Sequence, residues 1–309
     1  MIILYRTHID FVLDFQVPTS SEEWKAIAKD FSLKWNFPHC LGALDGKHVV
    51  MQAPAHAGSH FFNYKKTHSI VLLALVDANY RFIFVDSGCN GRISDGGVSS
   101  RCTLSSSLER NELSLPDDEG LSDGSPPLPF VVVADDAFPL KRNIMKPYPF
   151  RNQPAQNRVF NYRLSRARRC VENAFGILCQ IFRIFRRPIL VDAEKSQKIV
   201  LAACSLHNYI LMKSSSTSYS GLADREDDDG TLIPGIWRNE ALPTRSFLSI
   251  PSKEATITQR VPLMFERNLT SFSCRPRESF AGNMQIYNIF TVFLFLSLDQ
   301  VHDVNLEIK

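Results

Sequence analysis

The chain has 309 residues, a net charge of +3 and 44% hydrophobic residues, which are ordinary values for a globular protein. This length suffices for one large domain or two small ones, and the small net charge does not by itself indicate a polyanionic partner. Seven cysteines, an odd number without a CxxC pair, favour free thiols over a disulfide framework or a zinc site. Arg6 and Asp10 interrupt the apolar N-terminal run, so we expect no signal peptide.

A helix is predicted close to the N-terminus. Ser20 opens the run SSEE, which is typical of a capped helix start because hydroxyl and carboxylate groups suit the positive end of the helix dipole. Apolar residues then recur at helical spacing until Pro38. We interpret residues 1–36 as a helical remnant of an upstream region.

The next part of the chain, up to residue 134, has the texture of β-strands. Its four apolar runs are LGALDGKHVVMQ (41–52), SIVLLALVDANY (69–80), YRFIFVDSG (80–88) and FVVVA (130–134). The run DAN at 77–79 supplies turn residues, so the second and third strands are predicted to form a hairpin. A short helix is predicted around Ser105–Leu113.

Two longer helices follow. The segments are NYRLSRARRCVENAFGILCQIF (161–182) and KSQKIVLAACSLHNYILM (195–212). The first has apolar residues at helical spacing, and the second is apolar around most of its circumference, which indicates burial. Strands followed by helices predict an α/β fold with a functional site at the strand ends.

The pattern weakens after residue 212. Residues 213–309 are interpreted as a linker, an acidic run and a poorly ordered C-terminal tail. The apolar stretch at 286–298 is shorter than the ~20 residues that a bilayer requires, so no membrane association is expected.

Three acidic residues stand in settings that indicate chemistry. Asp45 and Asp135 follow or lie within apolar strands, and Glu172 lies on the arginine-rich helix. A carboxylate at a buried strand is costly unless a positive charge meets it, and three converging carboxylates suit a hard divalent cation. Each acid also has a structural alternative: Asp45 as a turn residue, Asp135 as a helix cap, and Glu172 as an ion-pair partner of an arginine on its own helix.

Positive charge is concentrated in the part of the sequence that contains Glu172. Between Arg151 and Leu190 there are nine arginines and one acid, Glu172. This one-sided charge favours phosphate binding, although a solvated helix face is the alternative. The residues predicted to contact nucleic acid are Lys47, Lys141, Arg142, Arg163, Arg166, Arg168 and Arg169.

The motifs together resemble the PIF/Harbinger transposases and the Harbinger transposase-derived nucleases. They are GALDGKHV (42–49), VDSGCNGRISDGG (85–97), VVADDAFPL (132–140), RARRCVENAFGIL (166–178) and SLHNYI (205–210). The resemblance covers residues 37–212 and implies an RNase H-like mixed sheet flanked by helices. It also implies a DDE nuclease site that hydrolyses phosphodiesters by a two-metal mechanism with Mg²⁺ or Mn²⁺.

The resemblance also implies roles for individual residues. The three family acids fall on Asp45, Asp135 and Glu172, as metal ligands and catalytic residues, with Asp136 as the alternative to Asp135. DNA is the implied substrate, a Myb/SANT-like protein is an allowed partner, and the nucleus is the expected location, with the cytoplasm as the alternative. A catalytically inactive, domesticated or decayed DNA- or protein-binding module is the alternative function.

Overall fold

The structure is a computed structural model of the chain. It describes residues 15, 17–54, 57–90, 103–122, 124–149, 151, 153–213, 221–227, 231–239 and 246–249.

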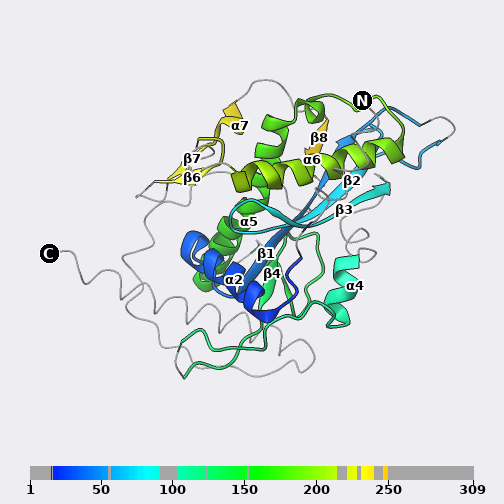
Figure 1. The fold of residues 1–309 in the computed structure, drawn as a ribbon. Helices are drawn as coiled ribbons and strands as arrows, with labels where there is room; N and C mark the ends of the chain where they lie inside the picture. Colours follow the sequence, from blue (N-terminus) through cyan, green and yellow to red (C-terminus); the bar gives the residue numbers. More distant parts are fainter. Residues whose placement is uncertain are drawn as a thin grey trace.

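A mixed β-sheet forms the centre of the protein (Figure 1). Its strands are β1 (Cys40–Val50), β2 (Ser69–Val76), β3 (Phe82–Asn90), β4 (Val131–Val133), β5 (Ile144–Met145) and β8 (Phe247–Ser249). The order across the sheet is β3-β2-β1-β4-β5, and β8 pairs with β1 as well. The first three strands run antiparallel, whereas β4 and β5 continue the sheet in parallel from β1.

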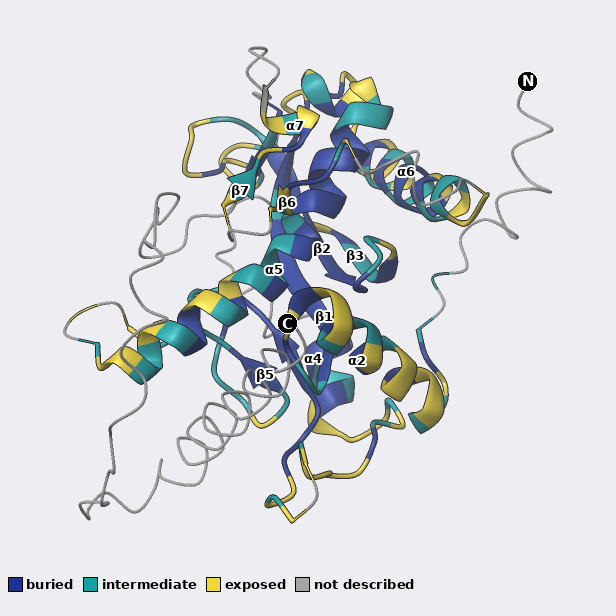
Figure 2. Ribbon diagram, turned by 90° about the vertical axis from the view of Figure 1, so that its left-hand side faces the viewer, coloured by how far each residue is buried: buried dark blue, intermediate teal, exposed yellow. Residues whose placement is uncertain are grey.

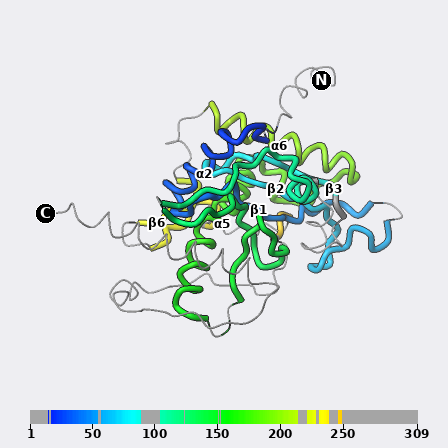
Figure 3. The backbone as a smooth tube through the Cα atoms, turned by 90° about the horizontal axis from the view of Figure 1, so that it is seen from below, coloured from blue at the N-terminus to red at the C-terminus, as the bar shows by residue number. Residues whose placement is uncertain are grey.

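The hairpin predicted between the second and third strands is confirmed, and its path can be followed in Figure 3. Asp77 closes the turn, because its Oδ1 accepts hydrogen bonds from the backbone N–H groups of Asn79 at 2.8 Å and Arg81 at 2.9 Å. An aspartate that bonds to backbone two residues ahead substitutes for part of a turn's own hydrogen bonding. The strand run therefore ends at Val76 because Asp77 redirects the chain.

Helices cover the sheet. They are α2 (Ser21–Trp35), α4 (Thr103–Glu109), α5 (Ala155–Ile181) and α6 (Ala193–Lys213), with a 3₁₀ turn η1 (Arg183–Arg186) between the last two. The cap predicted for α2 is present, since Ser20 Oγ accepts from Glu23 N at 3.3 Å.

Helix α5 starts six residues earlier than its apolar spacing predicts. Pro154 stands directly before it, and proline is tolerated there because the first N–H groups of a helix need no intrahelical acceptor.

Two cores lie on opposite faces of the sheet, and the strands between them are buried (Figure 2). On one face, Val171 and Phe175 of α5 pack with Ala43 and Val49 of β1. On the other face, Trp24 of α2 packs with sheet residues and with α4. Because β-strand side chains alternate, this two-sided burial explains the nearly continuous apolar runs. The predicted RNase H-like α/β fold is confirmed.

Part of the segment after residue 213 also packs against this domain. It contains β6 (Arg225–Glu226), β7 (Leu232–Ile233) and α7 (Ile236–Asn239), in addition to β8. Sequence patterns placed these residues in a linker and tail, because elements of two to four residues have no periodicity to detect. The apolar stretch at 286–298 lies outside the described residues. Among those that are described, no helix combines the length and the apolar character that a membrane crossing needs.

Candidate active site

Strand pairing places Asp45 and Asp135 level with each other on neighbouring strands, just past the end of β4. Strands β1 and β4 are parallel, and Ala43 lies opposite Val133. Asp45 and Asp135 each follow two residues after this pair. Equal displacement along parallel neighbouring strands puts both side chains at the carboxyl end of β4, where open α/β sheets hold their ligands.

Asp45 is buried, with 7% of its surface exposed. Its Oδ1 accepts from Gly46 N at 2.9 Å, and its Oδ2 lies 3.6 Å from Lys47 Nζ. Lys47 Nζ is in turn 5.6 Å from the ring centroid of Phe175 on α5, so the face of β1 that carries these groups is turned toward this helix. Lys47 thus supplies positive charge beside this carboxylate.

Asp135 is half-buried, and its Oδ1 accepts from Ala137 N at 3.0 Å. Burial and the negative charge of Asp45 raise the pKa of Asp135 to about 6, although Arg168 opposes this shift. A carboxylate whose proton affinity is raised by a neighbouring carboxylate lacks sufficient positive charge beside it. Such a pair is the kind of group that a divalent cation neutralises.

The neighbouring Asp136 has a different environment. Its Oδ1 is 3.2 Å from Lys146 Nζ, and the same ammonium group donates to the Asp136 backbone carbonyl at 3.0 Å. Asp136 is therefore already paired with a cation, whereas Asp135 meets the charge of Asp45.

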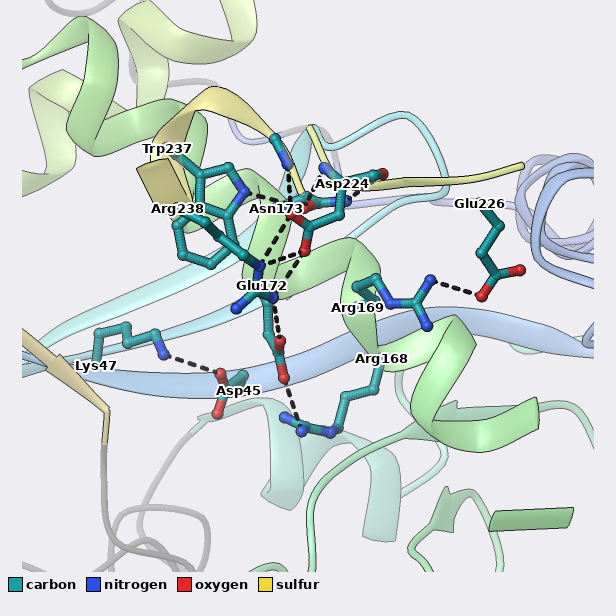
Figure 4. A network of polar contacts seen from close by, with 11 residues as sticks. Asp45, Lys47, Arg168, Arg169, Glu172, Asn173, Asp224, Glu226, Trp237 and Arg238 are labelled. Atoms are coloured by element: carbon teal, nitrogen blue, oxygen red, sulfur yellow. Dashed lines mark hydrogen bonds and ion pairs between the residues drawn. The ribbon is translucent and has the colours of Figure 1, made fainter. Parts of the chain in front are cut away.

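Glu172 lies on α5 between two guanidinium groups (Figure 4). Its Oε1 is 2.7 Å from Arg168 Nη2, one helical turn earlier, and its Oε2 is 3.4 Å from Arg238 Nη2. Burial disfavours the charged carboxylate, but Arg168, Lys47 and Arg238 outweigh it and hold the pKa of Glu172 below its ordinary value. The alternative that Glu172 pairs with an arginine of its own helix is realised.

Arg168 connects the three acids electrostatically. Burial lowers its pKa, but the negative charges of Glu172, Asp45 and Asp135 outweigh burial and raise it. The guanidinium group of Arg168 on α5 therefore interacts electrostatically with all three predicted metal ligands.

The donor set fits a divalent cation in part. Asp45 and Asp135 offer hard carboxylate oxygens with excess negative charge, which suits Mg²⁺ or Mn²⁺. Glu172 has both carboxylate oxygens beside arginines. Within the residues that the structure describes, no three His, Cys, Asp or Glu side chains form a group that could hold a metal ion. Asp45 and Asp135 could thus bind a divalent cation together. Glu172 would first have to give up its contact with Arg168 or Arg238 to join them.

Most of the side chains predicted to contact nucleic acid are engaged in ion pairs. Lys141 pairs with Glu109, Arg142 with Asp118, and both Arg166 and Arg169 with Glu226. Of the nine arginines counted between residues 151 and 190, these pairs involve Arg166 and Arg169. The prediction that these residues contact DNA stays a prediction.

Residues that the sequence analysis did not single out complete the surroundings of Glu172. They are Asn173, Asp224, Trp237 and Arg238, which hydrogen-bond to one another or to Glu172. Asn173 adjoins Glu172 in sequence, but the other three lie more than fifty residues away in a segment without periodicity. No local pattern could have found them.

Comparison with protein families matches residues 44–208, just over half of the chain, to the family described as DDE superfamily endonuclease. The chain belongs to this family. All three predicted acids fall inside the matched region, whereas Asp224, Trp237 and Arg238 lie beyond it. This match, together with the relatives named below, confirms the resemblance to Harbinger-type proteins.

Curated relatives give the same picture. The chain is 28% identical over 197 residues to "Protein ALP1-like" of Arabidopsis thaliana, a match that covers 63% of this chain and 48% of the relative. It is 27% identical over 197 residues to the human "Putative nuclease HARBI1", covering 63% of this chain and 52% of that protein. The chain thus spans about half the length of these relatives. No solved structure matches it.

Proposed function

We propose that this protein is a metal-dependent DNA endonuclease that hydrolyses phosphodiester bonds. The observation that supports it most directly is the parallel β1–β4 register, which places Asp45 and Asp135 level with each other at the carboxyl end of β4. Family membership and the word nuclease in the name of the human relative agree with this reaction class.

Each residue of the site has a role in the proposal. Asp45, Asp135 and Glu172 would hold two divalent ions, Mg²⁺ or Mn²⁺. Bound ions of this kind activate water and stabilise the leaving oxygen of a phosphodiester. Lys47 holds positive charge beside Asp45, where it can meet a substrate phosphate. Arg168 offsets the repulsion among the acids, and its pair with Glu172 would have to open for Glu172 to hold an ion.

The experiment is a nicking assay with the purified full chain on supercoiled plasmid, in Mg²⁺, Mn²⁺ or EDTA. We expect cleavage that requires metal and that is lost in Asp45→Asn, Asp135→Asn and Glu172→Gln. Glu194→Gln is the matched control, because Glu194 is exposed and pairs only with Lys198 among the described contacts. Metal-dependent cleavage that survives all three site substitutions would refute the assignment.

A second candidate is a DNA- or protein-binding module without turnover. It is favoured by the arginines at both oxygens of Glu172 and by the absence of a three-residue metal group among the described residues. DNA binding that persists in EDTA, with no cleavage in either metal, would support this candidate over the endonuclease. A nuclear location and a Myb/SANT-like partner remain proposals that rest on the family resemblance.

A further inference from the structure

Arg238 is held in place by Asp224. The Arg238 Nε donates to both Asp224 oxygens, at 2.9 and 2.7 Å, and its Nη2 is 2.7 Å from Oδ2. The Asp224 side chain is fully buried and also accepts from Gly235 N at 2.8 Å. A buried carboxylate that loses its cation is costly, so this pair fixes the position of the guanidinium group.

Aromatic packing fixes the same guanidinium from a second direction. The Arg238 Cζ lies 4.1 Å from the ring centroid of Trp237. Trp237 Nε1 donates to Asn173 Oδ1 at 3.2 Å. Asn173 also exchanges two hydrogen bonds with the backbone of Asp224, at 3.0 and 3.2 Å. Since Asn173 directly follows Glu172, the segment is placed against the helical turn that carries this acid.

The fixed guanidinium reaches Glu172 with its Nη2. Figure 4 shows the chain of contacts from Asp224 through Arg238 to the Glu172 carboxylate, with Arg168 at the other side. Arg168 is a neighbour of Glu172 on the same helix. Arg238 comes from α7, and its contacts with Asp224 and Trp237 hold its guanidinium group in place. From this arrangement we propose that Arg238 is a positioning residue, which sets the orientation of the Glu172 carboxylate. Its effect on catalysis rests on the proposed endonuclease function.

The competing explanation is that Arg238 only holds the segment of residues 221–239 against α5 and does not orient the Glu172 carboxylate. A separate contact already performs docking: Glu226 pairs with Arg166 at 2.8 Å and with Arg169 at 2.7 Å, which joins the same segment to the same helix. Glu226→Gln therefore removes docking charge without touching Arg238. It is the matched control for Arg238→Gln.

The first test does not depend on activity. Thermal unfolding of the full chain is measured for Arg238→Gln, Glu172→Gln and the double variant. If the two side chains interact as proposed, the loss of Tm in the double variant is smaller than the sum of the single losses by roughly 2–4 °C. Additive losses would overturn the proposal, and they would do so even if the chain proves to be no nuclease.

The second test measures the Mn²⁺ concentration that gives half-maximal thermal stabilisation, together with plasmid nicking. Arg238→Gln should raise this midpoint or lower the nicking rate by roughly 10–100-fold, as partners that orient metal ligands do. Arg238→Lys keeps the charge but not the paired hydrogen bonds, so it should recover part of the loss. Glu226→Gln should keep the Mn²⁺ midpoint within about twofold of that of the unmodified chain.

The outcomes separate the two proposals. Equal effects of Arg238→Gln and Glu226→Gln would show that the segment only docks, and tighter Mn²⁺ binding in Arg238→Gln would show that Arg238 opposes the site; either result overturns the positioning role. If the unmodified chain neither binds Mn²⁺ nor nicks DNA, the endonuclease proposal fails, and the unfolding comparison alone decides the role of Arg238.

Discussion

Arg168 and Glu172 are joined one helical turn apart on α5, with Arg168 Nη2 2.7 Å from Glu172 Oε1. The same guanidinium feels the charges of Asp45 and Asp135. A monovalent cation from the chain therefore faces the carboxylates that a divalent cation would use. Because like charges repel, the two cations compete for these acids.

Arg168→Gln tests this competition. We expect the variant to be less stable without metal, because three acids lose a shared counter-charge. With metal, its affinity for Mn²⁺ should rise by roughly tenfold, or about 1.4 kcal/mol, because the site becomes more negative. The measurement is calorimetric titration with Mn²⁺ and thermal unfolding in EDTA. Weaker Mn²⁺ binding in Arg168→Gln would show that the arginine assists the ions and does not compete with them.

Asp135 and Asp136 can be separated by the same titration. Asp135→Asn should abolish Mn²⁺ binding, because this residue faces Asp45 in the electrostatic pair. Asp136→Asn should leave the affinity within about twofold and cost at most about 1 kcal/mol, the range of a partly exposed ion pair such as Asp136–Lys146. The reverse pattern would assign the metal ligand to Asp136.

Replacing Gly176 on α5 by alanine is expected to lower the stability of the protein. A Cβ there would lie under 3.0 Å from three ring atoms of Trp237. Gly→Ala inside a helix ordinarily stabilises by about 1 kcal/mol, but displacing a packed indole should make Gly176→Ala destabilising by roughly 1–3 kcal/mol. Chemical denaturation measures the change. Gly221→Ala is the control, because its nearest neighbour would be Ile236 at 3.7 Å; a stabilised Gly176→Ala would show that Trp237 does not pack there.

His207 should make the fold sensitive to acid. Its side chain is fully buried, and its Nε2–H donates to the Tyr80 carbonyl at 2.9 Å, while Nδ1 has no partner among the described residues. Burial lowers the pKa of His207 to about 4. Between pH 6.5 and about 4 the unfolded chain binds this proton and the folded chain does not, so the free energy of unfolding falls as the pH falls.

His207→Gln measures this contribution, because glutamine keeps an N–H donor for Tyr80 and does not titrate. Over the window from pH 6.5 to about 4, the decrease in the free energy of unfolding should be roughly 2–3 kcal/mol smaller in the variant. Denaturant unfolding at pH 7.5, 6, 5 and 4.5 provides the comparison. Parallel curves for the two proteins would contradict the buried, neutral histidine.

The sequence predicted strands β1 to β4 because they carry strong local signals, whereas β5 and β8, of two and three residues, were not predicted. The run from Ile70 to Val76 is apolar throughout, and Asp77 supplies the turn that ends it. Helix α5 was recognised from its apolar spacing, but its start was misplaced because the first turn carries few apolar residues. The short elements after residue 220 have no period, so their packing could not be inferred.

The three acids illustrate the division between sequence and tertiary structure. Their identities, their settings on two strands and a helix, and the family motifs around them were determined by the sequence alone, since these are properties of neighbouring residues. Whether Glu172 faces a cation site or an arginine depended on contacts with Arg168 and Arg238, and the second of these joins residues 66 positions apart. Electrostatic partners at that separation are chosen by packing, which only the folded chain decides.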